Sequence, residues 1–199
     1  MSASPADDRP MTDPEPGPIA APTEEAPEPW LRGPLPAVDP LLAPVIFSLA
    51  QVREDLARWI APLGEAQLWE RPGGLAPVGF QLRHMARSLD RLTTYLEGRP
   101  LSDAQLAALR TEMEPGGRDE LLAELHANLD RTAATAAALD PARLREPRQV
   151  GRRHLPTTVI GLLVHIAEHT QRHLGQAIVT AKLLRRPGEP AAGPAPPRT

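Results

Sequence analysis

The chain has 199 residues, a formal net charge of −3 and no cysteine. The lack of cysteine excludes disulfides, zinc–thiolate sites and a cysteine nucleophile, so any reacting thiol has to come from a co-substrate. Aromatic residues make up only 3% of the chain. This low content favours aliphatic helices over a β-sandwich, and together with the negative charge it gives no indication of nucleic-acid binding.

Proline is concentrated at both ends of the chain, with 11 of the 25 prolines in the first forty residues. Such segments bury too little apolar surface to order themselves. We therefore expect an acidic, Pro-rich disordered tail over residues 1–38, a domain over residues 39–185 and a second disordered tail over residues 186–199. Trp30 and Leu31 are candidates to dock on the domain.

The spacing of apolar residues predicts four long helices and one short helix between the tails. Asp39 is a suitable N-cap for the first helix, with Pro40 at its first position, although Pro44 leaves the exact start open. No segment shows the alternation of a strand, so we expect an all-α four-helix bundle. The long helices are predicted at residues 39–60, 78–97, 118–139 and 156–184, and the short one begins at Ser102 or Asp103.

The N-terminal sequence MSASPADDRP lacks the basic patch and apolar run of a secretory signal. The uncharged stretch over residues 157–167 is interrupted by a histidine and is too short to span a membrane. We therefore expect a cytoplasmic protein that contacts neither membranes nor nucleic acid.

Three of the six histidines, His165, His169 and His173, follow one another at intervals of four in the last predicted helix. Residues at i and i+4 lie one above the other on a helix, so an adjacent pair can bind one divalent ion of zinc, nickel, copper or iron. All three cannot bind the same ion, because i and i+8 are roughly 12 Å apart. His84, in the middle of the second predicted helix, is the candidate third ligand.

Three imidazoles that leave one coordination position open are typical of a catalytic metal site, where a bound water or thiol has a lowered pKa. The alternative is that these histidines are solvated or bonded to backbone carbonyls. A metalloprotease HEXXH motif is excluded, because Ile166 follows His165. Glu168 either orients His169 or faces solvent, and we favour the second.

Over residues 41–185 the chain resembles the DinB-like superfamily, a set of metal-binding four-helix bundles. In that family one histidine of the second helix joins two histidines four residues apart on the last helix, followed by a Gly-Gln pair. The resemblance rests on the loop with Trp69, Gly73 and Gly74, on PVGFQLRH at residues 77–84 and on HIAEHTQRHLGQ at residues 165–176.

The resemblance implies that His84, His169 and His173 bind a divalent metal ion, with zinc or nickel favoured, and it implies no other cofactor. Leu174 departs from the arginine that often follows the last histidine in the family. His165 is the candidate catalytic residue, as a general base, a hydrogen-bond partner of a ligand or a bonded core residue. Gly175 is expected to permit close approach of a helix or substrate.

Characterised relatives are similar to S-transferases and isomerases that use bacillithiol, mycothiol or glutathione. We therefore expect a metal-dependent, detoxification-type transferase that activates a low-molecular-weight thiol for attack on a small electrophilic substrate. The alternatives are a hydrolase that uses metal-bound water, or a non-catalytic metal-binding stress-response protein. A homodimer is expected from the relatives. Candidates to bind an anionic reactant are Arg83, Arg87, Arg152 and Arg153.

Overall fold

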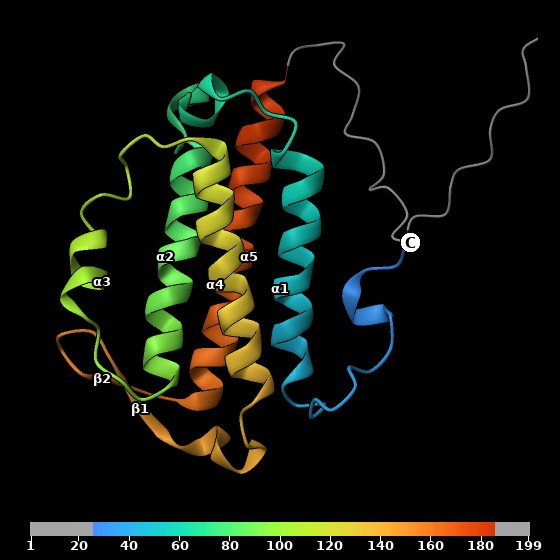
Figure 1. Ribbon diagram of the computed structural model, residues 1–199, viewed down its shortest axis with the longest axis vertical. Helices are drawn as coiled ribbons and strands as arrows, with labels where there is room; N and C mark the ends of the chain where they lie inside the picture. The colour runs from blue at the N-terminus through green and yellow to red at the C-terminus, as the bar shows by residue number, and fades with distance from the viewer. Residues whose placement is uncertain (1–25, 186–199) are drawn as a thin grey trace, which may run out of the picture.

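The computed structural model describes residues 26–185 and has four long helices that run alongside one another (Figure 1). This arrangement confirms the predicted all-α bundle. The short helix α3 (Asp103–Ala108) lies outside the bundle and begins with a capping box formed by Ser102 and Gln105. The long helices are α1 (Ala43–Asp55), α2 (Val78–Leu96), α4 (Arg118–Ala137) and α5 (Val159–Leu184).

Helix α2 is central to the packing, because it lies against both α4 and α5. Its fully buried leucines Leu82, Leu89 and Leu96 recur every seven residues, which keeps them on one face. Ile166 and Ala181 of α5 are also fully buried. Each large aliphatic side chain removed from water contributes roughly 1.5–3 kcal/mol, so this packing stabilises the bundle.

The first helix begins later than the predicted start at residue 39 or 40. Helix α1 begins at Ala43, which places Pro44 within its first turn. Proline is tolerated there but would remove a hydrogen bond further inside a helix. Asp39 instead caps a preceding turn by accepting from Leu41 N at 2.9 Å. A π-helical turn over Leu56–Ile60 extends α1 to its predicted end.

A β-hairpin lies between α4 and α5, although no segment of the sequence showed the alternation of a strand. Strand β1 (Pro147–Val150) pairs antiparallel with β2 (Leu155–Thr158). The prediction that the last helix begins at residue 156 is therefore wrong. Thr158 caps α5 by accepting from Gly161 N at 3.2 Å. The turn of the hairpin is attached to α2, since Gly151 N donates to Tyr95 Oη at 3.2 Å.

Part of the segment expected to be an N-terminal tail contacts α1. Residues Pro29–Leu31 form a 3-10 turn, and Arg32 makes two hydrogen bonds to the carboxylate of Glu54, at 2.6 and 2.8 Å. Pro29 is buried, whereas Trp30 and Leu31 are mostly exposed. The predicted tail residues 1–25 and 186–199 lie outside the described residues.

Among residues 26–185, no helix combines the length and apolar character needed to cross a bilayer.

Candidate metal centre

Helices α2 and α5 bring together the three histidines that the sequence analysis selected. One ring nitrogen from each of His84, His169 and His173 lies within 4.8 Å of the other two. The ring centroid of His84 lies 5.2 Å from that of His169 and 4.3 Å from that of His173. The i, i+4 spacing places the centroids of the two α5 imidazoles 4.5 Å apart, and the packing of α2 on α5 adds the third ring.

The geometry of the ring nitrogens fits a divalent ion. His84 Nδ1 donates to Glu112 Oε2 at 2.7 Å, and His173 Nδ1 donates to Gln81 Oε1 at 2.7 Å. Both rings therefore offer Nε2. His84 Nε2 lies 3.4 Å from His169 Nε2. Two imidazole nitrogens on one tetrahedral zinc ion are about 3.3 Å apart, given a zinc–nitrogen distance of about 2.05 Å.

Two hydrogen-bonded chains hold the candidate ligands in place. Glu112, in the segment after α3, accepts from His84 and also from Arg91 at 3.0 Å. On the other side, Gln81 donates to Gln176 Oε1 at 3.0 Å. Carboxylate and carbonyl partners of this kind fix the tautomer and orientation of a metal-binding histidine.

Neither Glu112 nor Gln81 was predicted from the sequence as a hydrogen-bond partner of a candidate ligand. Gln81 lies three residues before His84, and this i, i+3 spacing on one helix is a signal that was available. Glu112 lies 28 residues from His84 in a loop, where no spacing rule applies. Gln176, which the resemblance singled out, contacts Gln81 and supports the ligand indirectly.

The electrostatics of the cluster favour neutral imidazoles. Burial, followed by repulsion from neighbouring histidines, lowers the pKa of His169 to about 4. Burial and the proximity of His84 lower the pKa of His173 to about 4. Burial raises the pKa of Glu112, but its hydrogen bond to His84 and the charge of Arg91 lower it more, so the net shift is downward. At neutral pH the α5 histidines can thus bind a metal ion, and Glu112 is ionised.

His165 is not part of the cluster formed by His84, His169 and His173. Its side chain is 46% exposed. The interpretation of His165 as a bonded core residue is therefore wrong. Its ring centroid lies 5.2 Å from that of His169, and its Nδ1 donates to Glu168 Oε1 at 2.7 Å. Glu168 also pairs with Arg172 and does not orient His169. A side chain at Gly175 would meet nothing within 4 Å, so no helix approaches closely there.

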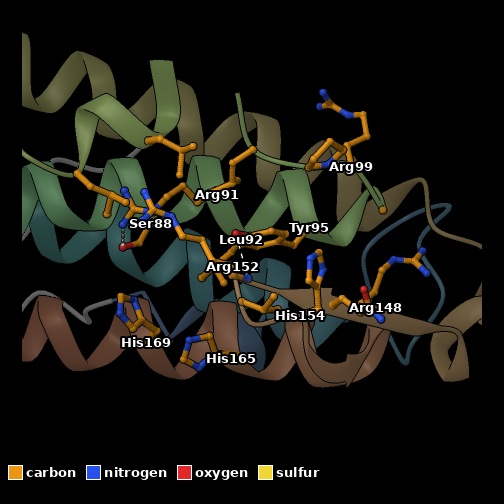
Figure 2. A pocket seen from close by; sticks show the side chains of 18 of the residues that line it. Ser88, Arg91, Leu92, Tyr95, Arg99, Arg148, Arg152, His154, His165 and His169 are labelled. Atoms are coloured by element: carbon orange, nitrogen blue, oxygen red, sulfur yellow. Dashed lines mark hydrogen bonds between the residues drawn. The ribbon is translucent and has the colours of Figure 1, made fainter. Parts of the chain in front are cut away.

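A cavity of about 980 Å³ lies beside the cluster. His84, His165 and His169 contribute to its wall, together with residues of α2, α3 and the β1–β2 hairpin. Figure 2 shows His165 and His169 on α5 facing Ser88 and Arg91 of α2. The candidate ligands His84 and His169 are therefore accessible to a molecule bound in this cavity.

The family model described as the DinB superfamily matches residues 48–177, which include all three candidate ligands. Among proteins with curated descriptions, none matches the chain closely enough to count as a relative. The matched segment begins within α1 and ends within α5, so it contains the helices that form the site.

Proposed function

The chain belongs to the DinB superfamily, which is often metal-binding, and from this premise we propose that it is a divalent-metal-dependent enzyme that transfers a small thiol to an electrophile. One observation carries the proposal: three imidazoles converge beside a cavity of about 980 Å³. Small-molecule sites commonly measure about 300–1,000 Å³. The cavity therefore has room for a thiol co-substrate and a small electrophile together.

The donor set supports zinc or nickel as the ion. His84, His169 and His173 offer nitrogen only, and imidazole suits both metals. When bound, such an ion supplies Lewis acidity that lowers the pKa of a thiol or water in the open position. The chain has no cysteine, so its own residues cannot compete with the co-substrate as thiolates.

His165 is the candidate proton acceptor in this proposal. Its Nδ1 donates to Glu168, which leaves Nε2 as the acceptor, and the residue lines the cavity. The reacting thiol would lose its proton to His165 or to solvent. The sulfur would then form a bond to the electrophilic carbon, and the leaving group would depart with the electron pair. No oxidant or reductant is needed.

Metal analysis of the purified protein tests the site. We expect about one ion per chain in the wild type, and less than a tenth of that in His84→Ala, His169→Ala and His173→Ala. His165→Ala is the matched control, because it removes an imidazole from the same helix, and it should retain the ion. Unchanged metal content in both His84→Ala and His169→Ala would refute the site.

Activity with defined reactants tests the reaction. Glutathione with a chloronitrobenzene dye should give a thioether and chloride at a rate that depends on the metal ion. Ester hydrolysis without thiol would favour the hydrolase. Retention of metal without either activity, across a panel of small thiols, would favour a metal-binding protein of the stress-response type. The homodimer and the cytoplasmic location stay predictions.

A further inference from the structure

We propose that the cavity selects an amphipathic organic anion, whose negatively charged oxygen group is bound by Arg152 in the turn of the β1–β2 hairpin. The inference deepens the proposed function, because it names the chemical class of a reactant for the same site. The binding step itself requires no metal ion, so it can be tested separately.

The charge of the cavity wall is the first observation. None of the described residues that line it is acidic, whereas the lining includes four arginines: Arg91, Arg99, Arg148 and Arg152. A concave surface that carries charge of one sign concentrates ligands of the opposite sign. The cavity is therefore expected to prefer anions over cations.

Three of these arginines are already paired. Arg91 bonds to Glu112 at 3.0 Å, and Arg99 pairs with Glu97. Arg148 bonds to Glu146 at 3.1 Å and donates to the carbonyl of Leu96 at 3.0 Å.

Arg152, by contrast, has no hydrogen bond or ion pair with any described residue. Its guanidinium is therefore the one in the cavity wall with all of its donors available to a ligand, and a planar fork of donors matches a carboxylate.

The structure leaves one of the four arginines that the sequence offered as candidates to bind an anionic reactant. Arg83 is buried and bonds to Glu120 at 3.1 Å. Arg87 donates to the carbonyl of Ala108 at 2.8 Å and pairs with Glu124. Arg153 is exposed but does not line the cavity. Arg152 alone combines a place in the wall with a free guanidinium.

The backbone that carries Arg152 is held in a defined turn. Val150 pairs with Leu155 across the hairpin, and Gly151 and His154 have φ angles of 70° and 48°. Few residues other than glycine adopt this region readily. The bond from Gly151 N to Tyr95 Oη ties the turn to α2, so Arg152 is presented from a supported position.

The rest of the wall indicates the other part of the ligand. Four leucines from α2, α3 and the residues that flank α3 line the cavity: Leu92, Leu101, Leu106 and Leu109. In Figure 2 the imidazoles of His165 and His169 lie toward one side of the pocket, and His154 of the hairpin turn lies toward the other. A ligand whose apolar part packs against the leucines and whose charged group lies at the hairpin would extend toward the candidate metal ligands.

A pair of fluorescent probes tests the charge requirement. 1-Anilinonaphthalene-8-sulfonate carries a negative oxygen group, and N-phenyl-1-naphthylamine has the same rings without it. In Arg152→Ala the Kd of the sulfonate should rise about tenfold, as expected for the loss of one charge-assisted contact of about 1.4 kcal/mol. The Kd of the neutral probe should change less than twofold, and Arg152→Lys should recover part of the affinity.

Arg153→Ala is the matched control, because it removes an adjacent exposed guanidinium outside the cavity wall. It should leave both Kd values within twofold of the wild type. Equal effects of Arg152→Ala and Arg153→Ala, or no effect of Arg152→Ala, would overturn the proposal. Competition of the sulfonate probe by 4-phenylbutyrate but not by its amide is expected, and competition by the amide would also overturn it.

The same titrations on chelator-treated protein separate this inference from the proposed function. The difference between Arg152→Ala and Arg153→Ala should persist without metal. If the difference holds while the histidine variants keep their metal, only the proposed metal site fails. If it is absent while those variants lose their metal, only the anion proposal fails.

Discussion

The two sides of α2 differ in how completely their polar groups are paired. On the side that faces α4, Thr93 and Thr132 share a hydrogen bond of 2.8 Å in the buried interior, and Arg131 pairs with Asp90 at the edge. On the side that faces α5, the Nε2 atoms of His84 and His169 face each other, and His169 Nδ1 is buried without a hydrogen-bond partner among the described residues.

This difference distinguishes the α2–α4 interface from the interface that carries the candidate metal site. Between α2 and α4 the Thr93–Thr132 and Arg131–Asp90 contacts each have a donor and an acceptor. Between α2 and α5 it supplies several nitrogen lone pairs and too few protons, which is the arrangement that a cation completes. Changes at the α4 interface should therefore act on stability, and changes at the α5 interface should act mainly on metal binding.

The largest effect on stability is expected from Leu125→Ala on α4, since this leucine is fully buried. Removing it from the core should lower the free energy of unfolding by about 2–5 kcal/mol. Urea denaturation measures the change. The metal content of the folded variant should equal that of the wild type. Loss of the ion from a folded Leu125→Ala protein would show that the two interfaces are not separable.

A smaller effect, on metal affinity, is expected from Glu112→Gln. Weakening the partner that orients His84 should reduce affinity about 10- to 100-fold, as measured by competition with a chromogenic chelator. Glu114→Gln is the matched control, since this exposed side chain lies two residues away and makes no bond to a ligand. Equal affinities for the two variants would remove Glu112 from the site.

The pH dependence of the metal-free protein gives a further test. The lowered pKa values of His169 and His173, each about 4, mean that below about pH 6.5 the unfolded chain binds protons that the folded chain does not. The free energy of unfolding should therefore fall as pH drops from 6.5 toward 4, and these groups should have no effect above pH 7.

Between pH 7 and pH 5 the expected loss is on the order of 1–2 kcal/mol, because both side chains are only half-buried and solvent screens their charge. Thermal unfolding at each pH measures it. The double variant His169→Ala/His173→Ala shows how much of the pH dependence belongs to the cluster. An identical pH dependence in this variant would contradict the assignment.

The smallest effect is expected from Arg131→Ala. The side chains of Arg131 and Asp90 are 34% and 31% exposed, and ion pairs of this kind contribute less than about 1 kcal/mol. Denaturation should show a change of that size, with unchanged metal affinity. A loss above 2 kcal/mol would mean that this ion pair stabilises the α4 interface as much as a buried leucine does.

Most of the helices and the two α5 histidines of the candidate site were predictable because their signals are local. The leucines of α2 recur at helical spacing, and the Ser102–Gln105 pair predicts the start of a capped helix. The i, i+4 spacing of His169 and His173 places them on one face of any helix that forms there. Such relations depend only on the 3.6-residue period of the backbone.

The hairpin was not predictable from the same signals. Its strands are four residues long, which is too short for alternation to be distinguished from chance. Its turn depends on contacts with α2 that are distant in the chain, such as the bond from Gly151 to Tyr95. For the same reason, the sequence proposed four arginines for an anion and could not select Arg152.

The sequence by itself determined that the chain forms a helical bundle and that two histidines of the last helix are adjacent, because both follow from the geometry of one helix. Only the tertiary structure decided that His84 meets them, that Glu112 orients His84, that His165 is exposed and that the hairpin lines a cavity beside the cluster. These relations join segments tens of residues apart, and their geometry is set by how the helices and loops pack, which no local spacing encodes.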